Sequence, residues 1–257
     1  MDFLQAIILG VVEGVTEFLP ISSTGHMILA AQLLKIPETE FVKSFQIFIQ
    51  LGAVSAVAVL FFQKYIQNFK VWKNVIASFI PTAIAGLIFY KLVKEVLLAN
   101  PMVTLTALFI GGVALIVVEL IHKEQDSHVG KLEDLTLKQS FLIGVAQAIS
   151  IIPGVSRSAA TIVGGMLLGV KRKTAVEFSF LLAVPTLFAA AGLDLVKTKL
   201  HFSSSEWMIF LLGLVVSFIT ALVVVRWFLS YIQKNNFILF GVYRIVLAIL
   251  FWILVLH

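Results

Sequence analysis

The chain of 257 residues is 60% hydrophobic and only 13% charged, with a mean hydropathy of +1.05. Because soluble domains hold roughly 45–50% apolar residues, this composition excludes a soluble globular protein and predicts an integral membrane protein. The net charge of +5 comes from Lys and Arg residues scattered over short loops, so it indicates no nucleic-acid partner. The absence of cysteine excludes disulfides and thiolate metal sites.

The first residues, MDFLQAIILG, carry an acid where a signal peptide has its basic region, and no small-residue cleavage site follows. We therefore expect them to belong to the mature fold. Further along, six apolar runs are long enough for transmembrane helices of about 20 residues. In chain order, the predicted spans are Phe41–Phe62, Lys73–Val93, Pro101–His122, Thr174–Val196, Glu206–Phe228 and Phe237–Leu256.

The Lys and Arg residues predict how these spans cross the membrane. Threading the six spans places eleven of these residues on one side and six on the other. The more basic side is expected to be cytoplasmic. Both termini then lie outside the cell, and the polar loop of residues 123–137 lies in the cytoplasm.

Two segments that do not fit the six spans resemble each other. They are QAIILGVVEGVTEFLPISSTGH, starting at Gln5, and QSFLIGVAQAISIIPGVSRSAAT, starting at Gln139. The aligned pairs are Gln5 with Gln139, Gly10 with Gly144, Glu13 with Gln147 and Ser22 with Ser156, whereas Pro20 and Pro153 fall one residue out of step. An internal repeat at a spacing of 134 residues indicates gene duplication. We expect a single membrane domain, 1–257, with repeat halves of approximately 1–122 and 138–257.

Each of these segments reads as a broken helix. Roughly 14 helical residues precede a break at Pro with Gly or Ser and roughly 12 follow it, so neither arm crosses a hydrocarbon core of about 30 Å. By the charge count, the two hairpins enter from opposite sides. The predicted fold class is an all-α integral membrane protein of six transmembrane helices plus two re-entrant helical hairpins in an inverted-topology repeat. Such repeats bring broken-helix tips together around a cavity near the midplane.

Charged side chains stand at both predicted tips. Glu13 and Glu17 are four residues apart and share one helix face, so they need a cation beside them unless one is protonated. That cation is either a metal ion or the guanidinium of Arg157 in the other tip. The alternative is a buried ion pair that only holds the hairpins together. Arg157 keeps its proton, and its fork suits phosphate oxygens.

Hydroxyls and one histidine complete the candidate set. They are Ser22, Ser23, Thr24 and His26 in the first hairpin, and Ser156 and Ser158 in the second. Ser and Thr are preferred N-caps, but helix N-termini that converge also bind phosphate, so both interpretations stay open for each hydroxyl. His26 is either a proton donor or a polar partner for a neighbour.

The strings EGVTEFLPISSTGH and PGVSRSAAT, in a chain of this length and hydropathy, resemble the bacterial undecaprenyl-diphosphate phosphatase family, also known for bacitracin resistance. The similarity runs along the whole chain, including FQIFIQLGA from Phe45 and EFSFLLAVP from Glu177. One departure is Ala159, where many members carry Gly. The family motifs map onto Glu13, Glu17, Ser22, Ser23, Thr24, His26, Ser156 and Arg157.

The resemblance implies an enzyme in the bacterial cell membrane that removes the terminal phosphate of a polyprenyl diphosphate from the extracytoplasmic side. Glu13 and Glu17 would hold a divalent cation, Mg²⁺ or Ca²⁺, and Arg157 would stabilise the transferring phosphoryl group. Ser23 could attack with Glu17 or His26 as base, or a metal-bound water could attack directly. Ser22, Thr24, Ser156 and Arg157 are the expected substrate-binding residues. Membrane lipids are expected partners, and a homodimer stays open.

Two other classes of protein share some of these sequence features. A secondary transporter or lipid flippase also uses inverted repeats and a midplane anion site, and hydropathy does not exclude it. The string STGH is similar to a short SGH element of the phosphatidic acid phosphatase superfamily, but the mechanism of that superfamily needs a second histidine. After Arg157 the chain reads SAATIVGGML, without one.

Overall fold

A computed structural model describes residues 1–37, 39–97, 100–197 and 203–256, and within these ranges the chain forms ten α-helices and no strands. The helices are α1 (Phe3–Thr16), α2 (Ser23–Leu33), α3 (Glu40–Tyr65), α4 (Phe69–Leu92), α5 (Pro101–Ile121), α6 (Leu137–Ala148), α7 (Arg157–Leu167), α8 (Arg172–Lys197), α9 (Ser204–Tyr231) and α10 (Ile238–Leu256). A π-helical turn, Val93–Leu97, extends α4, and short 3₁₀ turns occupy Leu132–Asp134 and Ile149–Ile151.

Five helices are long and apolar enough to cross a membrane: α3, α4, α5, α8 and α9. This confirms the all-helical membrane class. The sixth predicted span corresponds to α10, which over its described apolar stretch, Ile238–Ile253, is not among these five. The six-span layout therefore stays a prediction.

The two predicted hairpins are built from matching parts. Capping boxes start α1 and α6, with Asp2 and Gln5 in the first and Thr136 and Gln139 in the second. The glutamines also make equivalent bonds across their hairpins. Gln5 Nε2 donates to Leu34 O at 3.3 Å, and Gln139 Nε2 donates to Leu168 O at 3.0 Å. The second arms, α2 and α7, are both 11 residues long.

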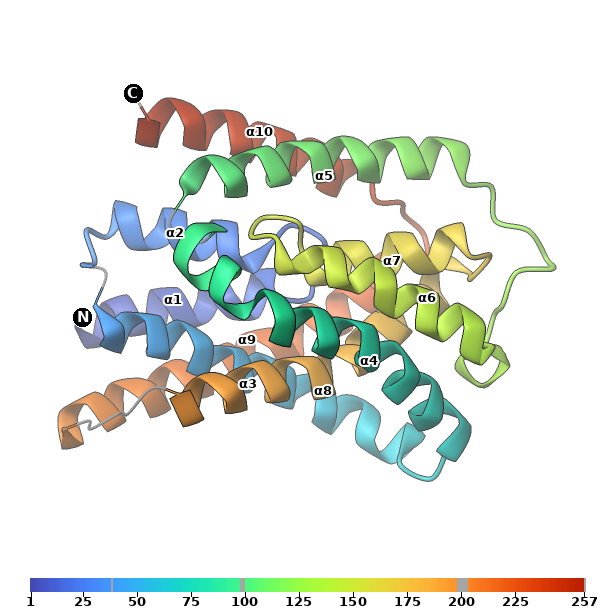
Figure 1. Cartoon of the computed structure of the whole chain (residues 1–257), viewed down its shortest axis with the longest axis horizontal. Coiled ribbons are helices and arrows are strands. Elements are labelled where there is room, and N and C mark those ends of the chain that lie inside the picture. The colour runs from blue at the N-terminus through green and yellow to red at the C-terminus, as the bar shows by residue number, and fades with distance from the viewer. Residues whose placement is uncertain (38, 98–99, 198–202, 257) are drawn as a thin grey trace.

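Each hairpin packs mainly on a helix from the other half of the chain. The helix α1 lies along α9, and α6 lies along α4. The second contact is so close that a Cβ at Gly144 of α6 would collide with the backbone of Ser78. In Figure 1, α5 and α10 run antiparallel at one side of the molecule, both termini lie at one end, and the loop between α5 and α6 lies at the other.

At that other end, an arginine cluster ties three helices together. Arg172, at the start of α8, forms ion pairs with Glu119 and Glu124. Glu119 also accepts from Phe237 N, just before α10, at 3.1 Å. This cluster joins the end of α5, the start of α8 and the start of α10.

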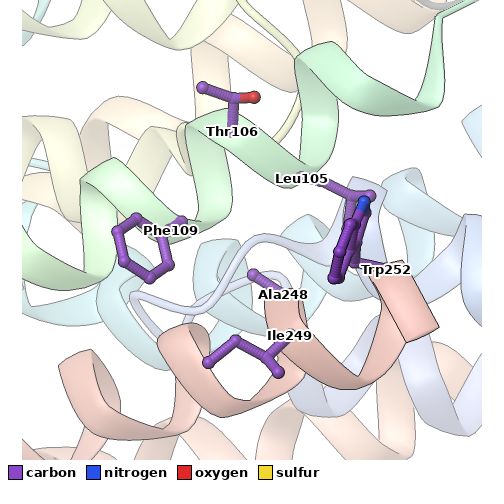
Figure 2. A pocket seen from close by; sticks show the side chains of 6 residues that line it. All are labelled: Leu105, Thr106, Phe109, Ala248, Ile249 and Trp252. Carbon is purple, nitrogen blue, oxygen red and sulfur yellow. The ribbon is translucent and has the colours of Figure 1, made fainter.

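A shallow groove of about 240 Å³ runs between α5 and α10 (Figure 2). Its lining residues are Leu105, Thr106, Phe109, Ala248, Ile249 and Trp252. None of the candidate site residues lines it, so it is separate from the polar site described below.

Candidate active site

The candidate site forms where two loops meet. We call residues 17–22, between α1 and α2, the first tip, and residues 152–156, before α7, the second tip. Ser158 Oγ at the start of α7 donates to Leu19 O of the first tip at 2.8 Å. The predicted meeting of the two hairpins is thus present in the structure.

Glu17, Ser23 and Arg157 form a continuous chain of contacts. Ser23 Oγ donates to Glu17 Oε2 at 2.5 Å, and Arg157 Nη2 donates to Glu17 Oε1 at 3.0 Å. The side chains of Glu17 and Arg157 are only 6% and 9% exposed. Low exposure strengthens the ion pair, because less water screens it. One carboxylate therefore orients both a hydroxyl and a guanidinium.

A second bond fixes the direction of the Arg157 fork. Its Nη1 donates to Ser179 O of α8 at 3.0 Å. Thr161 Oγ1 in turn donates to Ser179 Oγ at 2.7 Å, and the guanidinium carbon lies 5.5 Å from the centre of the Phe18 ring. The arginine is thus held from both hairpins and from α8. Sequence reasoning did not single out Ser179 or Thr161.

Glu13 lies one helical turn before Glu17 and is fully buried. Neither of its carboxylate oxygens has a hydrogen-bond partner in the described part of the chain. A buried carboxylate without a partner is costly, so this position calls for a proton or a cation. The repeat partner, Gln147, is neutral, and its amide nitrogen donates to Thr82 and Thr186. Only the first hairpin offers an unsatisfied carboxylate.

The pair Glu13 and Glu17 suits a divalent cation by its chemistry, since Mg²⁺ and Ca²⁺ prefer carboxylate oxygens. Within the described ranges no group of three or more His, Asp or Glu side chains could hold a metal ion. A cation at this place would therefore need oxygens from a ligand or from water to complete its coordination. That arrangement fits a site whose metal binds together with a phosphate group.

His26 lies in the first turn of α2 and has two hydrogen-bond partners. Its Nδ1 is 2.8 Å from Ser22 O, and its Nε2 is 2.7 Å from the Tyr243 hydroxyl of α10. Because a carbonyl only accepts, Nδ1 carries a hydrogen and donates. The His26 and Tyr243 rings also stack, with centroids 5.5 Å apart. In this structure His26 contacts Tyr243 rather than Glu17 or Ser23.

The remaining predicted hydroxyls divide by what they bind. Ser156 caps α7 through the bond from Ala159 N, at 3.2 Å, whereas Ser22 makes no side-chain cap for α2. Both serines have positive φ, 74° and 70°, which is costly for residues with a Cβ and is typical of functional loops. Thr24 follows at the start of α2. The N-terminus of α2 is therefore the less satisfied of the two.

Arg244 of α10 is a further candidate, and it was not singled out from the sequence. It is fully buried and contacts both tips. The sequence contains a feature that could have identified it. Arg244 is a lone arginine inside the apolar run FGVYRIVLAIL, and such a residue is costly in a membrane and usually functional.

Comparison with known proteins finds similar sequences over almost the whole length of this chain. A family model described as bacitracin resistance protein BacA matches residues 6–250. An undecaprenyl-diphosphatase of Aquifex aeolicus is 50% identical over 96% of this chain and 96% of its own length. Proteins of the same name from a Sulfurihydrogenibium species and from Persephonella marina are 47% and 44% identical, over 98% and 100% of this chain and 99% and 100% of their own.

Proposed function

The chain belongs to the bacitracin resistance protein BacA family, and from that premise we propose that its two tips form the active site of an undecaprenyl-diphosphatase. The enzyme hydrolyses the lipid diphosphate to the monophosphate and inorganic phosphate. The observation that carries this proposal is the contact of Ser23 and Arg157 with the same buried carboxylate, Glu17. It joins a nucleophile, a base and an anion-binding group.

The geometry favours Ser23 as the nucleophile. In the proposed first step, Ser23 Oγ attacks the terminal phosphorus and its proton passes to Glu17, to which it already donates. The bond from phosphorus to the bridging oxygen breaks, and the lipid monophosphate leaves. Water then cleaves the phosphoserine, giving back the hydroxyl and releasing phosphate. Direct attack by water on the diphosphate is the competing route.

Arg157 stabilises the charge of the transferring phosphoryl group. A planar guanidinium can present two parallel N–H groups to phosphate oxygens. In this structure one side of the fork is committed to Glu17 and the other to Ser179. Two N–H groups stay open for phosphate oxygens: the Nε hydrogen, which has no partner among the described residues, and the second hydrogen of Nη2, which donates once, to Glu17.

Glu13 and Glu17 are the residues proposed to hold a divalent cation, Mg²⁺ or Ca²⁺. Such a cation would offset the repulsion between these carboxylates and the diphosphate and would polarise the phosphoryl oxygens. The supporting observation is the pair of Glu13 oxygens that lack a partner. Ser22, Thr24 and Ser156 are proposed to surround the substrate at the two helix N-termini.

The proposed location is the bacterial cell membrane, with the site open to the extracytoplasmic side and the fold an inverted repeat of two re-entrant hairpins and six spans. The matching hairpins and the antiparallel α5 and α10 support the inverted repeat (Figure 1). The two termini at one end agree with the predicted topology. One chain supplies Glu17, Ser23 and Arg157, so a homodimer is not required for the site.

The test is release of inorganic phosphate from undecaprenyl diphosphate by the purified protein in detergent. We expect Mg²⁺- or Ca²⁺-dependent turnover that Ser23→Ala removes while the melting temperature stays close to that of the wild type. A transporter or flippase would release no phosphate. Absence of turnover by a well-folded wild-type protein with either cation would overturn the proposal.

A further inference from the structure

Arg244 occupies an unusual position for a charged side chain. It is the largest fully buried side chain among the described residues, and all five of its N–H groups are used. Its acceptors are five backbone carbonyls: Pro20 (3.1 Å), Ala107 (3.1 Å), Leu108 (3.3 Å), Gly154 (2.8 Å) and Val155 (3.0 Å). No described carboxylate forms an ion pair with it. Its role is therefore to organise backbone rather than to neutralise an acid.

These carbonyls come from three separate segments that meet at the site. Pro20 belongs to the first tip, between Glu17 and Ser23. Gly154 and Val155 belong to the second tip, just before Arg157. The other two acceptors lie on α5, which serves as the fixed support. One rigid fork thus sets the position of one tip relative to the other.

The surrounding structure makes room for this fork. A Cβ at Gly111 of α5 would collide with the guanidinium of Arg244. Gly154 has a φ of +95°, and a Cβ there would collide with the backbone of Thr104 on α5. Close approach of α5, α10 and the second tip therefore depends on small residues.

We propose that Arg244 is a positioning residue for the phosphatase reaction: it holds the two tips in the register at which Glu17, Ser23 and Arg157 meet. This inference rests on the proposed function. A shift of about 1 Å in catalytic groups can cost roughly a hundredfold in rate, so a register error between the tips lowers kcat. The KM should change less, because all five N–H groups of Arg244 bind backbone carbonyls and none is left to bind substrate.

The substitutions Arg244→Lys and Arg244→Gln test the fork. Lysine keeps the charge but offers at most three donors, and glutamine offers two without charge. We expect kcat to fall at least about tenfold in the lysine variant and further in the glutamine variant, with KM changed by less than about threefold. The control is Arg172→Lys, which weakens an arginine cluster at the other end and should lower the melting temperature without a matching loss of kcat.

A second measurement does not need turnover. Hydrogen–deuterium exchange of the backbone should accelerate in both tips of Arg244→Lys and in neither tip of Arg172→Lys. If the Arg244 variants fold poorly, Gly111→Ala displaces the guanidinium without removing it. Its control is Gly86→Ala, where a Cβ meets nothing within 4 Å.

The outcomes separate the two proposals. If the folded wild type releases no phosphate, the proposed function fails. The rate of hydrogen–deuterium exchange in the two tips then decides alone whether Arg244 holds them together. If the wild type is active, two results overturn the positioning role. One is a kcat in Arg244→Lys, or in Gly111→Ala, that matches its control. The other is a rate of backbone hydrogen–deuterium exchange in both tips of Arg244→Lys that equals the wild-type rate.

Discussion

Replacing Arg157 by lysine separates a phosphate-binding arginine from a simple counter-ion. Arg157 donates to Glu17 from Nη2 and to Ser179 O from Nη1, both at 3.0 Å. Lysine keeps the charge, but its single nitrogen cannot reproduce two bonds in the fixed geometry of the fork. The substitution therefore removes at least one charge-assisted contact of the folded site.

The size of the effect follows from that loss. One hydrogen bond to a charged group is worth about 1.5–3 kcal/mol. At about 1.4 kcal/mol for each factor of ten in rate, Arg157→Lys should lower turnover roughly ten- to a hundredfold. If Arg157 only balanced the charge of Glu17, lysine would largely suffice, and the main symptom of Arg157→Ala would be poor folding.

The assay compares phosphate release by detergent-purified variants whose melting temperatures show that they are folded. Arg172→Lys is the matched control, because the same chemical change is made at an ion-paired arginine that lies beyond the opposite end of α7 from Arg157. An Arg157→Lys variant with normal melting and a near-normal rate would refute the reasoning and remove Arg157 from the catalytic residues.

Three further predictions follow from the site. Glu17→Gln should abolish most turnover and weaken its metal dependence, with Glu13→Gln less severe; wild-type rates in both at limiting Mg²⁺ would contradict the cation assignment. Ser23→Ala should lower the rate far more than Ser158→Ala does. The reason is that a lost cap or tip contact costs only about 0.5–2 kcal/mol, whereas a nucleophile cannot be replaced. Equal and mild losses of rate in both variants would show that both serines have a structural role. A cysteine introduced at Ser127 should resist an impermeant thiol reagent in intact cells and react after permeabilisation, whereas labelling in intact cells would overturn the predicted topology.

The breaks between α1 and α2 and between α6 and α7 could be predicted because their signals are local. Proline with Gly or Ser breaks each helix, and the repeat in the sequence aligned the starts of the two second arms. The structure begins α2 at Ser23 and α7 at Arg157, in agreement with that alignment. Two acids in one tip and an arginine in the other also indicated that the acids face either a metal ion or Arg157, and the structure shows the contact of Glu17 with Arg157.

The finer contacts depended on tertiary packing and were not predictable in the same way. Which hydroxyl caps a helix is decided by backbone geometry, so Ser156 and Ser22 could not be told apart by sequence. The side-chain partner of His26 Nε2 is Tyr243, more than 200 residues away. Arg244 is a different case, since its place in an apolar run was visible but its five carbonyl acceptors carry no sequence signature.

Each hairpin packs on a helix from the other half of the chain, and this affects the order in which the protein can fold during synthesis. Because α1 lies along α9 and α6 lies along α4, α1 lacks its main packing partner until residues beyond 204 have left the ribosome. The first hairpin must therefore wait, held by the insertion machinery or by lipid, while most of the chain is synthesised. Two polypeptides divided within the loop of residues 123–137 should for the same reason assemble only when both are present during insertion. The catalytic tip encoded first is thus among the last parts of the molecule to be completed.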